Sequence, residues 1–219
     1  MIVTTEVHEK PEGSFRILHT ADWHLGKRLN DQARDEEHRL FLAWLLNVVK
    51  EQAVDAIILA GDVFDTANPP QPAVKQYYDF VSDLSRQDKC AFVVIAGNHD
   101  SPAQLEAPKQ LLQVLGAQVV GNLADDPSAR IICLPDEEKP AVAVALIPFL
   151  RDQDLRVGKA GEGTEEIASQ MVAGIKRRYE ETAEAASEAG LACPLVATGH
   201  LTVVGSRTSD SELDIHIGG

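Results

Sequence analysis

The sequence has few cysteines and no long apolar run. Its three cysteines, Cys90, Cys133 and Cys193, are far apart and form no Cys-x-x-Cys pair. This spacing argues against a disulfide-built scaffold and a thiolate zinc site, and indicates reduced thiols in a cytosolic protein. No stretch approaches the roughly 18 apolar residues of a membrane-spanning helix, and residues 1 to 14 lack the apolar core of a signal peptide. We expect a soluble, cytoplasmic protein with no membrane partner.

Basic residues are also scarce. The chain has 20 Lys and Arg against 34 Asp and Glu, which gives a net charge of −14. Nonspecific DNA affinity comes mostly from cations that neutralise phosphates, so this composition argues against a general basic surface for nucleic acid. Binding to DNA would depend on ions held in a crevice and on local groups such as Lys27, Arg28 and Arg207. A solvated surface position is the simpler interpretation of each of these three.

The remaining composition is that of a globular protein. Of the 219 residues, 44% are hydrophobic and 25% are charged, which is enough for one sizeable core. The simplest organisation is a loosely ordered arm, residues 1 to 14, followed by one domain, residues 15 to 219. Apolar runs alternate with amphipathic stretches, which predicts an α/β sandwich. Strands are expected at 15–21, 56–59, 92–96 and 195–198, and helices at 31–53, 73–86 and 102–116.

The helix expected over residues 31–53 carries an apolar stripe at helical spacing, made up of Leu40, Phe41, Trp44, Leu45 and Val48. We expect this stripe to lie on the sheet. His38, in the same stretch, is not in a turn at a strand end. It is therefore expected at the surface or half-buried, away from the functional site.

From residue 118 onward, short apolar runs separated by turn-rich segments predict a second, more antiparallel sheet. These runs lie at 119–120, 130–134 and 142–149. A flexible loop is expected over residues 158–163, followed by a long amphipathic helix over residues 164–189. Glu165 and Glu166 would complement the dipole in the first turn of this helix, and Gly190 would end it.

Four apolar runs end at side chains that can bind a metal ion: Asp22-Trp23-His24, Gly61-Asp62-Val63-Phe64-Asp65, Gly97-Asn98-His99-Asp100 and Gly199-His200. Carboxylate, imidazole and amide ligands suit manganese, iron or zinc. A bridging carboxylate holds two ions about 3.5 to 4 Å apart, which stabilises the attacking and leaving oxygens of phosphoryl transfer. Asp62 is the best candidate bridge. Each motif alone is typical of an ordinary turn, but their joint occurrence favours one metal-binding crevice.

In this order, the motifs resemble those of the calcineurin-like metallophosphoesterases. The residues around them, at 17–26, 60–66 and 197–202 with Ser209-Asp210-Ser211, are similar to those of the SbcD nuclease subunits, a bacterial branch of that family. The resemblance runs from about Phe15 to the last residue. It implies the family's α/β fold, a sandwich of two mixed β-sheets flanked by helices.

The resemblance also implies a centre with two divalent metal ions, most simply Mn²⁺. Asp22 and His24 would hold one ion, Asn98 and His200 would hold the other, and Asp62 would bridge them.

His99 resembles the family's catalytic histidine, which would hydrogen-bond the scissile phosphate and assist departure of the leaving oxygen. Asp100 would orient His99, although a role in the turn or at the helix start is an equally good interpretation. Asp65 is left out of catalysis, because some relatives have a substrate-contacting histidine at its position.

The chain departs from the family pattern at its end. The family's motif series closes with a Gly-His-x-His segment whose two histidines complete the two ligand sets, and the sequence stops at Gly219 before any such segment. His216 lies on an apparent strand over residues 213–217, is not preceded by glycine and is a poor substitute. We expect a truncated domain without its C-terminal part, with weak metal binding and reduced or no activity.

The function implied by the resemblance is metal-dependent hydrolysis of DNA, as a double-strand exonuclease and single-strand or hairpin endonuclease in repair, recombination and replication. Its expected partners are DNA, an SbcC-like ATPase and a second copy of the chain, as a homodimer within a heterotetramer. The helices near the first two motifs would form the dimer contact. Two alternatives stay open. One is a phosphoesterase acting on a phosphoprotein or cyclic nucleotide, which the acidic composition mildly favours and the SbcD-like residues around the motifs disfavour; the other is an inactive, truncated interaction module.

Overall fold

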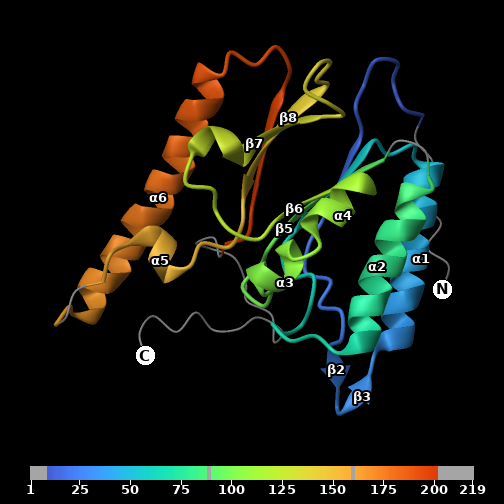
Figure 1. The fold of residues 1–219 in the computed structure, drawn as a ribbon, viewed down its shortest axis with the longest axis horizontal. Helices are drawn as coiled ribbons and strands as arrows, with labels where there is room; N and C mark the ends of the chain where they lie inside the picture. Colours follow the sequence, from blue (N-terminus) through green and yellow to red (C-terminus); the bar gives the residue numbers. More distant parts are fainter. Residues whose placement is uncertain (1–8, 88–89, 159–160, 202–219) are drawn as a thin grey trace.

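Two β-sheets pack face to face between two layers of helices (Figure 1). This computed structural model describes residues 9–87, 90–158 and 161–201. Arg207, the strand expected over residues 213–217 with His216, and the first eight residues of the expected arm lie outside the described residues, as does part of the loop expected over residues 158–163.

The first sheet is parallel throughout and has the strand order β1-β4-β5-β6. Its strands are β1 (Ile17–Thr20), β4 (Ala56–Ala60), β5 (Ala91–Ile95) and β6 (Ala117–Val120). The strands predicted at 15–21, 56–59 and 92–96 are confirmed. The assignment of residues 119–120 to the second sheet is wrong, because β6 pairs in parallel with β5. The helical connection between β5 and β6 is long enough to return the chain in parallel.

The second sheet has the order β7-β8-β9. Its strands are β7 (Ile131–Leu134), β8 (Val142–Ile147) and β9 (Leu195–Gly199). The β7–β8 pair is antiparallel and the β8–β9 pair is parallel, so the predicted second sheet is confirmed and is mixed. A short 3-10 helix, η1 (Pro127–Arg130), precedes β7, and α5 (Asp152–Leu155) and α6 (Thr164–Glu188) connect β8 to β9. A separate hairpin is formed by β2 (Arg28–Leu29) and β3 (Gln32–Ala33).

Helices α1 (Asp35–Glu51) and α2 (Gln71–Ser85) cover the outer face of the first sheet, and α6 lies against the second (Figure 1). The single helix expected over residues 102–116 is instead two, α3 (Pro102–Glu106) and α4 (Lys109–Val114). Pro108 lies between them. It breaks the helix because proline has no N–H to donate to the preceding turn.

Strand β4 shows why the sequence gives continuous apolar runs here. Ile57 and Leu59 belong to the core under the helices, whereas Ile58 and its alternate neighbours Ala56 and Ala60 belong to the core between the sheets. Successive side chains of a strand point to opposite faces, and both faces of this sheet are covered. An uninterrupted apolar strand is the consequence.

Helix α1 is rotated relative to the expected stripe. Leu40 and Trp44 are 54% and 41% exposed, so their predicted burial is wrong. The buried residues of the helix are His38, Leu42, Leu45, Val48 and Val49. Their spacing of four, three, three and one is that of one helical face. His38, expected at the surface or half-buried, is instead only 7% exposed.

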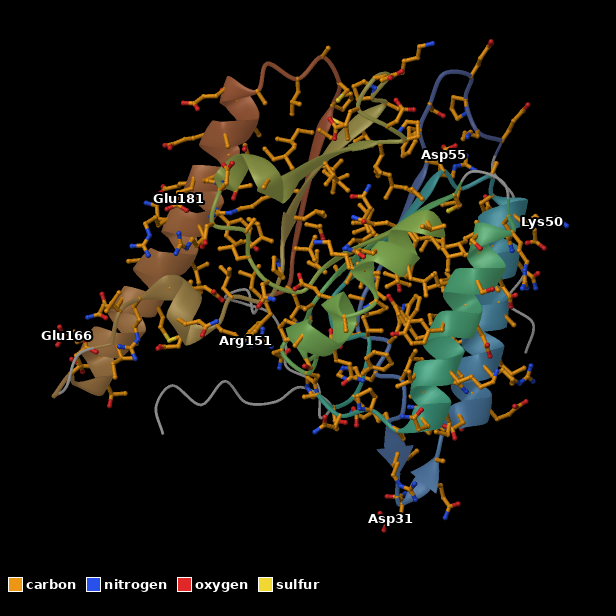
Figure 2. The ribbon with its side chains drawn as sticks, in the orientation of Figure 1. Asp31, Lys50, Asp55, Arg151, Glu166 and Glu181 are labelled. Carbon is orange, nitrogen blue, oxygen red and sulfur yellow. The ribbon has the colours of Figure 1, made fainter. Side chains whose placement is uncertain are left out.

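The described residues before β1 are held at the start of β4. Lys10 Nζ lies 2.8 Å from Asp55 Oδ1, and the Arg16 backbone N–H donates to Asp55 Oδ2 at 2.6 Å. Asp55 and Asp31, which is in the β2–β3 hairpin, lie at opposite ends of the first sheet (Figure 2). Among the described helices, none is both long and apolar enough to cross a membrane.

The packing between the sheets can be tested at Ile58, which is 1% exposed. We expect Ile58→Ala to lower the free energy of unfolding by about 2 to 5 kcal/mol, because it leaves a cavity where the surroundings relax only partly. Chemical denaturation measures this change. Val172→Ala, at a site that is 68% exposed on α6, is the control and should stay within about 0.5 kcal/mol of wild type. Equal effects of the two substitutions would contradict this account of the core.

Candidate metal centre

The candidate metal centre lies where β1, β4 and β5 end. Because these strands are parallel, their carboxyl ends meet at one edge of the sheet and bring Asp22, Asp62 and Asn98 together. The loops are tied to one another, since the Asp22 N–H donates to Gly61 O at 3.1 Å and the His24 N–H donates to Asp62 O at 3.0 Å. His200 arrives from the second sheet, at the end of β9.

The backbone at the centre is unusual. Asp22, His24 and Asp62 have φ angles of 58°, 45° and 52°, in the left-handed region that side chains other than glycine rarely occupy. Such conformations cost on the order of 1 to 3 kcal/mol each and persist only where the surrounding structure determines them. Three of them, at three candidate ligands, indicate that the loops are shaped by the site.

On one side of the centre, Asp22, His24 and Asp62 converge. His24 Nε2 lies 3.7 Å from Asp62 Oδ2 and 3.9 Å from Asp22 Oδ1. The ligand atoms of the three residues all lie within 4.8 Å of one another. Asp62 and His24 are buried and Asp22 is exposed, so this group of ligands opens to solvent on the Asp22 side.

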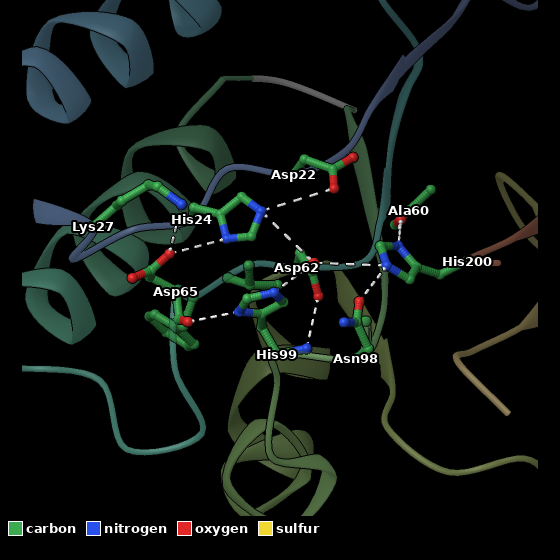
Figure 3. A network of polar contacts seen from close by, with 12 residues as sticks. Asp22, His24, Lys27, Ala60, Asp62, Asp65, Asn98, His99 and His200 are labelled. Atoms are coloured by element: carbon green, nitrogen blue, oxygen red, sulfur yellow. Dashed lines mark hydrogen bonds and ion pairs between the residues drawn. The ribbon is translucent and has the colours of Figure 1, made fainter. Parts of the chain in front are cut away.

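On the other side, His200 meets Asn98 and the same Asp62 oxygen. His200 Nε2 lies 3.0 Å from Asn98 Oδ1 and 3.6 Å from Asp62 Oδ2 (Figure 3). Its Nδ1 lies 2.8 Å from Ala60 O, which can only accept, so the proton belongs on Nδ1. Nε2 then presents a lone pair to two other electron-rich atoms. A cation is the group that makes this arrangement favourable.

The Asp62 carboxylate joins the two sides and is held by the backbone. It is 3% exposed, and its Oδ1 accepts the His99 N–H at 3.0 Å. With Oδ1 fixed in this way, Oδ2 faces both His24 and His200. Carboxylates and imidazoles in this arrangement fit a pair of divalent ions.

Two glycines leave the space that these side chains need. A Cβ on Gly97 would collide with the carboxylate and backbone N of Asp62, and a Cβ on Gly61 would collide with the His200 ring. Gly61 also has a φ of 92°, which favours glycine.

His99 lies beside the candidate ligands. Its Nδ1 is 2.7 Å from the Asp65 carbonyl oxygen, which fixes the ring. Its Nε2 is buried, has no hydrogen-bond partner among the described residues, and lies 4.0 Å from Asp62 Oδ2. A buried polar atom without a partner is costly, so this nitrogen is available for a bound substrate.

The expected contact between Asp100 and the His99 side chain is not among the hydrogen bonds of the described residues. Asp100 instead accepts the N–H groups of Val63, Phe64 and Gly97 at 3.2, 3.0 and 2.8 Å. Burial raises the pKa of Asp100, and these three N–H groups oppose that shift. The carboxylate thus ties the loop after β5 to the loop after β4, in line with its alternative interpretation as a turn residue.

Asp65, which the sequence-based prediction leaves out of catalysis, lies beside two histidines of the centre. Besides its carbonyl contact with His99, its Oδ1 lies 3.3 Å from His24 Nδ1, without hydrogen-bond geometry, and 3.3 Å from Lys27 Nζ. A carboxylate behind an imidazole orients it for metal binding. The signal was present in the sequence, since Asp65 closes the Gly-Asp-Val-Phe-Asp motif.

The three basic residues expected near the site do not lie together. Lys27 lies beside the centre (Figure 3), whereas the Arg28 guanidinium donates to the Asp31 carbonyl in the β2–β3 hairpin. Arg207 lies outside the described residues.

Comparison with known protein families agrees with this arrangement of candidate ligands. The sequence profile of the calcineurin-like phosphoesterases matches residues 15–157. The chain belongs to this family.

Among curated proteins, the chain is similar to the SbcD component of the nuclease SbcCD from several bacteria. It is 42% identical to that of Escherichia coli K12 over 207 residues, which cover 93% of the chain and 50% of the relative. For Rhodobacter capsulatus the identity is 39% over 216 residues, with 94% and 52% coverage, and for Bacillus subtilis 168 it is 35% over 207 residues, with 94% and 51% coverage. The chain thus spans about half the length of these relatives.

The space beside Gly97 gives a test of metal binding by this chain. We expect Gly97→Ala to weaken Mn²⁺ binding at least about tenfold, the scale seen when groups supporting metal ligands are changed, because the added methyl group displaces Asp62. Isothermal titration calorimetry measures this affinity. Gly163→Ala is the control, since a Cβ there meets nothing within 4 Å. Unchanged Mn²⁺ affinity in Gly97→Ala would exclude Asp62 as a required ligand.

The role of Asp65 can be tested separately. We expect Asp65→Asn to lower Mn²⁺ affinity by about tenfold, since His24 loses the carboxylate at its Nδ1. Asp79→Asn, which removes an exposed carboxylate paired with Lys75 on α2, serves as the control. The interpretation is contradicted if both variants bind Mn²⁺ as wild type does.

Proposed function

We propose that this chain carries the nuclease centre of an SbcD-like protein and hydrolyses phosphodiester bonds of DNA. The observation that carries the proposal is the position of Asp62, whose Oδ2 faces His24 on one side and His200 on the other. A carboxylate shared in this way suits a centre with two divalent ions. The similarity to the curated SbcD components of SbcCD nucleases favours DNA over other phosphodiesters.

The ion pair that we propose is Mn²⁺. Asp22 and His24 would hold one ion, Asn98 and His200 the other, and Asp62 both. When bound, such ions supply Lewis-acid stabilisation of the charge that develops on phosphoryl oxygens. The carboxylates of the centre would neutralise the ions, and the Asp65 carboxylate lies 3.3 Å from His24 Nδ1, on the side of the ring away from Asp62.

The chain's own contribution to bond cleavage is centred on His99. Because the Asp65 carbonyl accepts the proton of Nδ1, the ring is fixed with Nε2 directed at the space beside Asp62. In its protonated form, His99 donates from Nε2 to a phosphate oxygen, and that proton can pass to the leaving oxygen. Asp100 acts through the backbone of both loops, as a positioning residue for His99 and Asp62.

We also propose the assembly that the relatives' names suggest. The name SbcCD denotes a two-component nuclease, so an SbcC-like ATPase is the proposed partner, in a heterotetramer with two copies of this chain. The exposed apolar residues of α1 and α2, Leu40, Trp44 and Tyr78, supply apolar area for the contact between the copies. Work on DNA with such a partner, together with the three free cysteines, agrees with a cytoplasmic location.

The direct test is Mn²⁺-dependent cleavage of an end-labelled DNA duplex. It is carried out with the 219-residue chain and with a version extended through a Gly-His-x-His segment. We expect cleavage to require Mn²⁺ and to be stronger in the extended form, whose ions have more ligands. In the form that cleaves, His99→Ala should lower the rate by about 10² to 10⁴, the usual contribution of a general acid.

The outcomes separate the candidates. Cleavage that His99→Ala leaves unchanged would refute the mechanism and leave the family assignment in place. If neither form cuts DNA but a small phosphomonoester is hydrolysed, the nuclease proposal fails and a phosphoesterase for other substrates takes its place. An intact thermal transition without Mn²⁺ binding at millimolar concentration would support a module that only mediates interaction.

A further inference from the structure

A cavity of about 470 Å³ lies between the end of β1 and the first turns of α1. It adjoins the candidate metal centre, since Asp22 and His24 form part of its wall. The wall also includes Lys27, Arg34, His38 and Phe41. Lys27 and His24 lie on the same side of Asp62, opposite Asn98 and His200 (Figure 3). The lining of the cavity thus includes residues from the Asp22–His24 side of the centre. Its size falls in the range of small-molecule sites.

Arg34 is the unexplained group in this cavity. It precedes α1 and is half-buried. Within the described ranges, every other arginine donates a side-chain hydrogen bond, and Arg34 donates none and forms no ion pair. A half-buried guanidinium with five donors and no partner is suited to an anion, above all to the paired oxygens of a phosphate.

His38 is a second, independent indication of a ligand. It lines the cavity, is only 7% exposed, and its Nδ1 has no hydrogen-bond partner among the described residues. Burial lowers the pKa of His38, and the charge of Arg34 acts in the same direction, against Asp35, Glu37 and Asp65. The neutral ring has one donor and one acceptor nitrogen, which matches a sugar hydroxyl or ester oxygen.

The rest of the wall fits a sugar phosphate. Trp23 and Phe41 line it with apolar surface, their rings meeting edge to face at 5.9 Å. Of the two basic side chains that line the cavity, Lys27 is paired with Asp65, which leaves Arg34 to pair with a phosphate.

We propose that this cavity binds the sugar and phosphate of the nucleotide next to the scissile bond, on the Asp22–His24 side. Arg34 pairs with that nucleotide's phosphate, and His38 hydrogen-bonds its sugar or ester oxygen. The inference rests on the proposed nuclease function. The same chemistry is offered by a DNA strand and by a free mononucleotide; we assign the cavity to the DNA strand, because it continues directly from the metal centre.

The test is binding of a fluorescein-labelled single-stranded oligonucleotide in Ca²⁺, followed by fluorescence anisotropy at several salt concentrations. We expect Arg34→Gln to weaken binding several-fold and to lower the slope of log K against log[salt] by about 0.7 to 1, the value for one lost phosphate contact. Arg39→Gln removes an exposed arginine of α1 that is paired with Glu36, and it should leave both quantities unchanged. His38→Leu should weaken binding without changing the slope, and His38→Gln should restore part of the loss.

The controls keep the inference separate from the proposed function. If wild type binds DNA and Arg34→Gln has the same affinity and slope, the cavity assignment is overturned while the nuclease proposal stands. If Arg34→Gln lowers the temperature of thermal unfolding, Arg34→Lys is used in its place. This variant keeps the charge and must keep the slope of log K against log[salt]. A lower slope in Arg34→Lys also overturns the assignment. If neither the wild-type chain nor its form extended through the Gly-His-x-His segment binds DNA, the nuclease proposal fails. In that case, titration with thymidine 5′-monophosphate decides whether a mononucleotide occupies the cavity: Arg34-dependent binding supports it, and its absence overturns the site.

Discussion

The fixed position of the Asp62 carboxylate is the constraint on which the centre depends. One oxygen accepts a backbone N–H from the loop after β5, and the other faces imidazoles from the loop after β1 and from the end of β9. The Asp62 carboxylate thereby lies against residues at the ends of three other strands, β1, β5 and β9. The carboxylate of Asp100 acts on the same loops, since it accepts backbone N–H groups from those after β4 and β5. Together these bonds tie the loops after β4 and β5 to each other at the centre.

This arrangement requires strained backbone conformations, and it requires positions without a side chain next to Asp62 and His200. Asp22, His24 and Asp62 occupy left-handed conformations, and the absence of a Cβ at residues 61 and 97 is what lets His200 and Asp62 approach. Such strain is maintained by a well-packed framework. The apolar strands of the first sheet, covered by helices on one face and by the second sheet on the other, supply that framework. The candidate ligands thus follow the ends of buried strands.

Electrostatics explain how an acidic chain can serve an anionic substrate. The acidic side chains of the centre would bind cations, which changes the sign of the local potential without changing the surface elsewhere. In the neighbouring cavity, the Arg34 guanidinium and His38 add hydrogen-bonding groups away from the ions, and Lys27 is paired there with Asp65. A substrate would then be held by a few directed contacts. This accounts for a net charge of −14 in a proposed DNA-binding chain.

Most strands of both sheets, the long helices and the cluster of candidate ligands can be predicted from the sequence alone, because short apolar runs that end in Gly-Asp or Gly-His are local signals. The prediction for β6 names the wrong sheet, because strand partners depend on the return path of the chain. The predicted stripe of α1 is rotated, because Leu40 and Trp44 are apolar but exposed. Three features follow from the folded chain: the burial of His38, the position of Asp65 behind His24, and the bonds of Asp100 to the backbone of the loop after β4. Residues distant in the sequence form these surroundings, and no local periodicity encodes them.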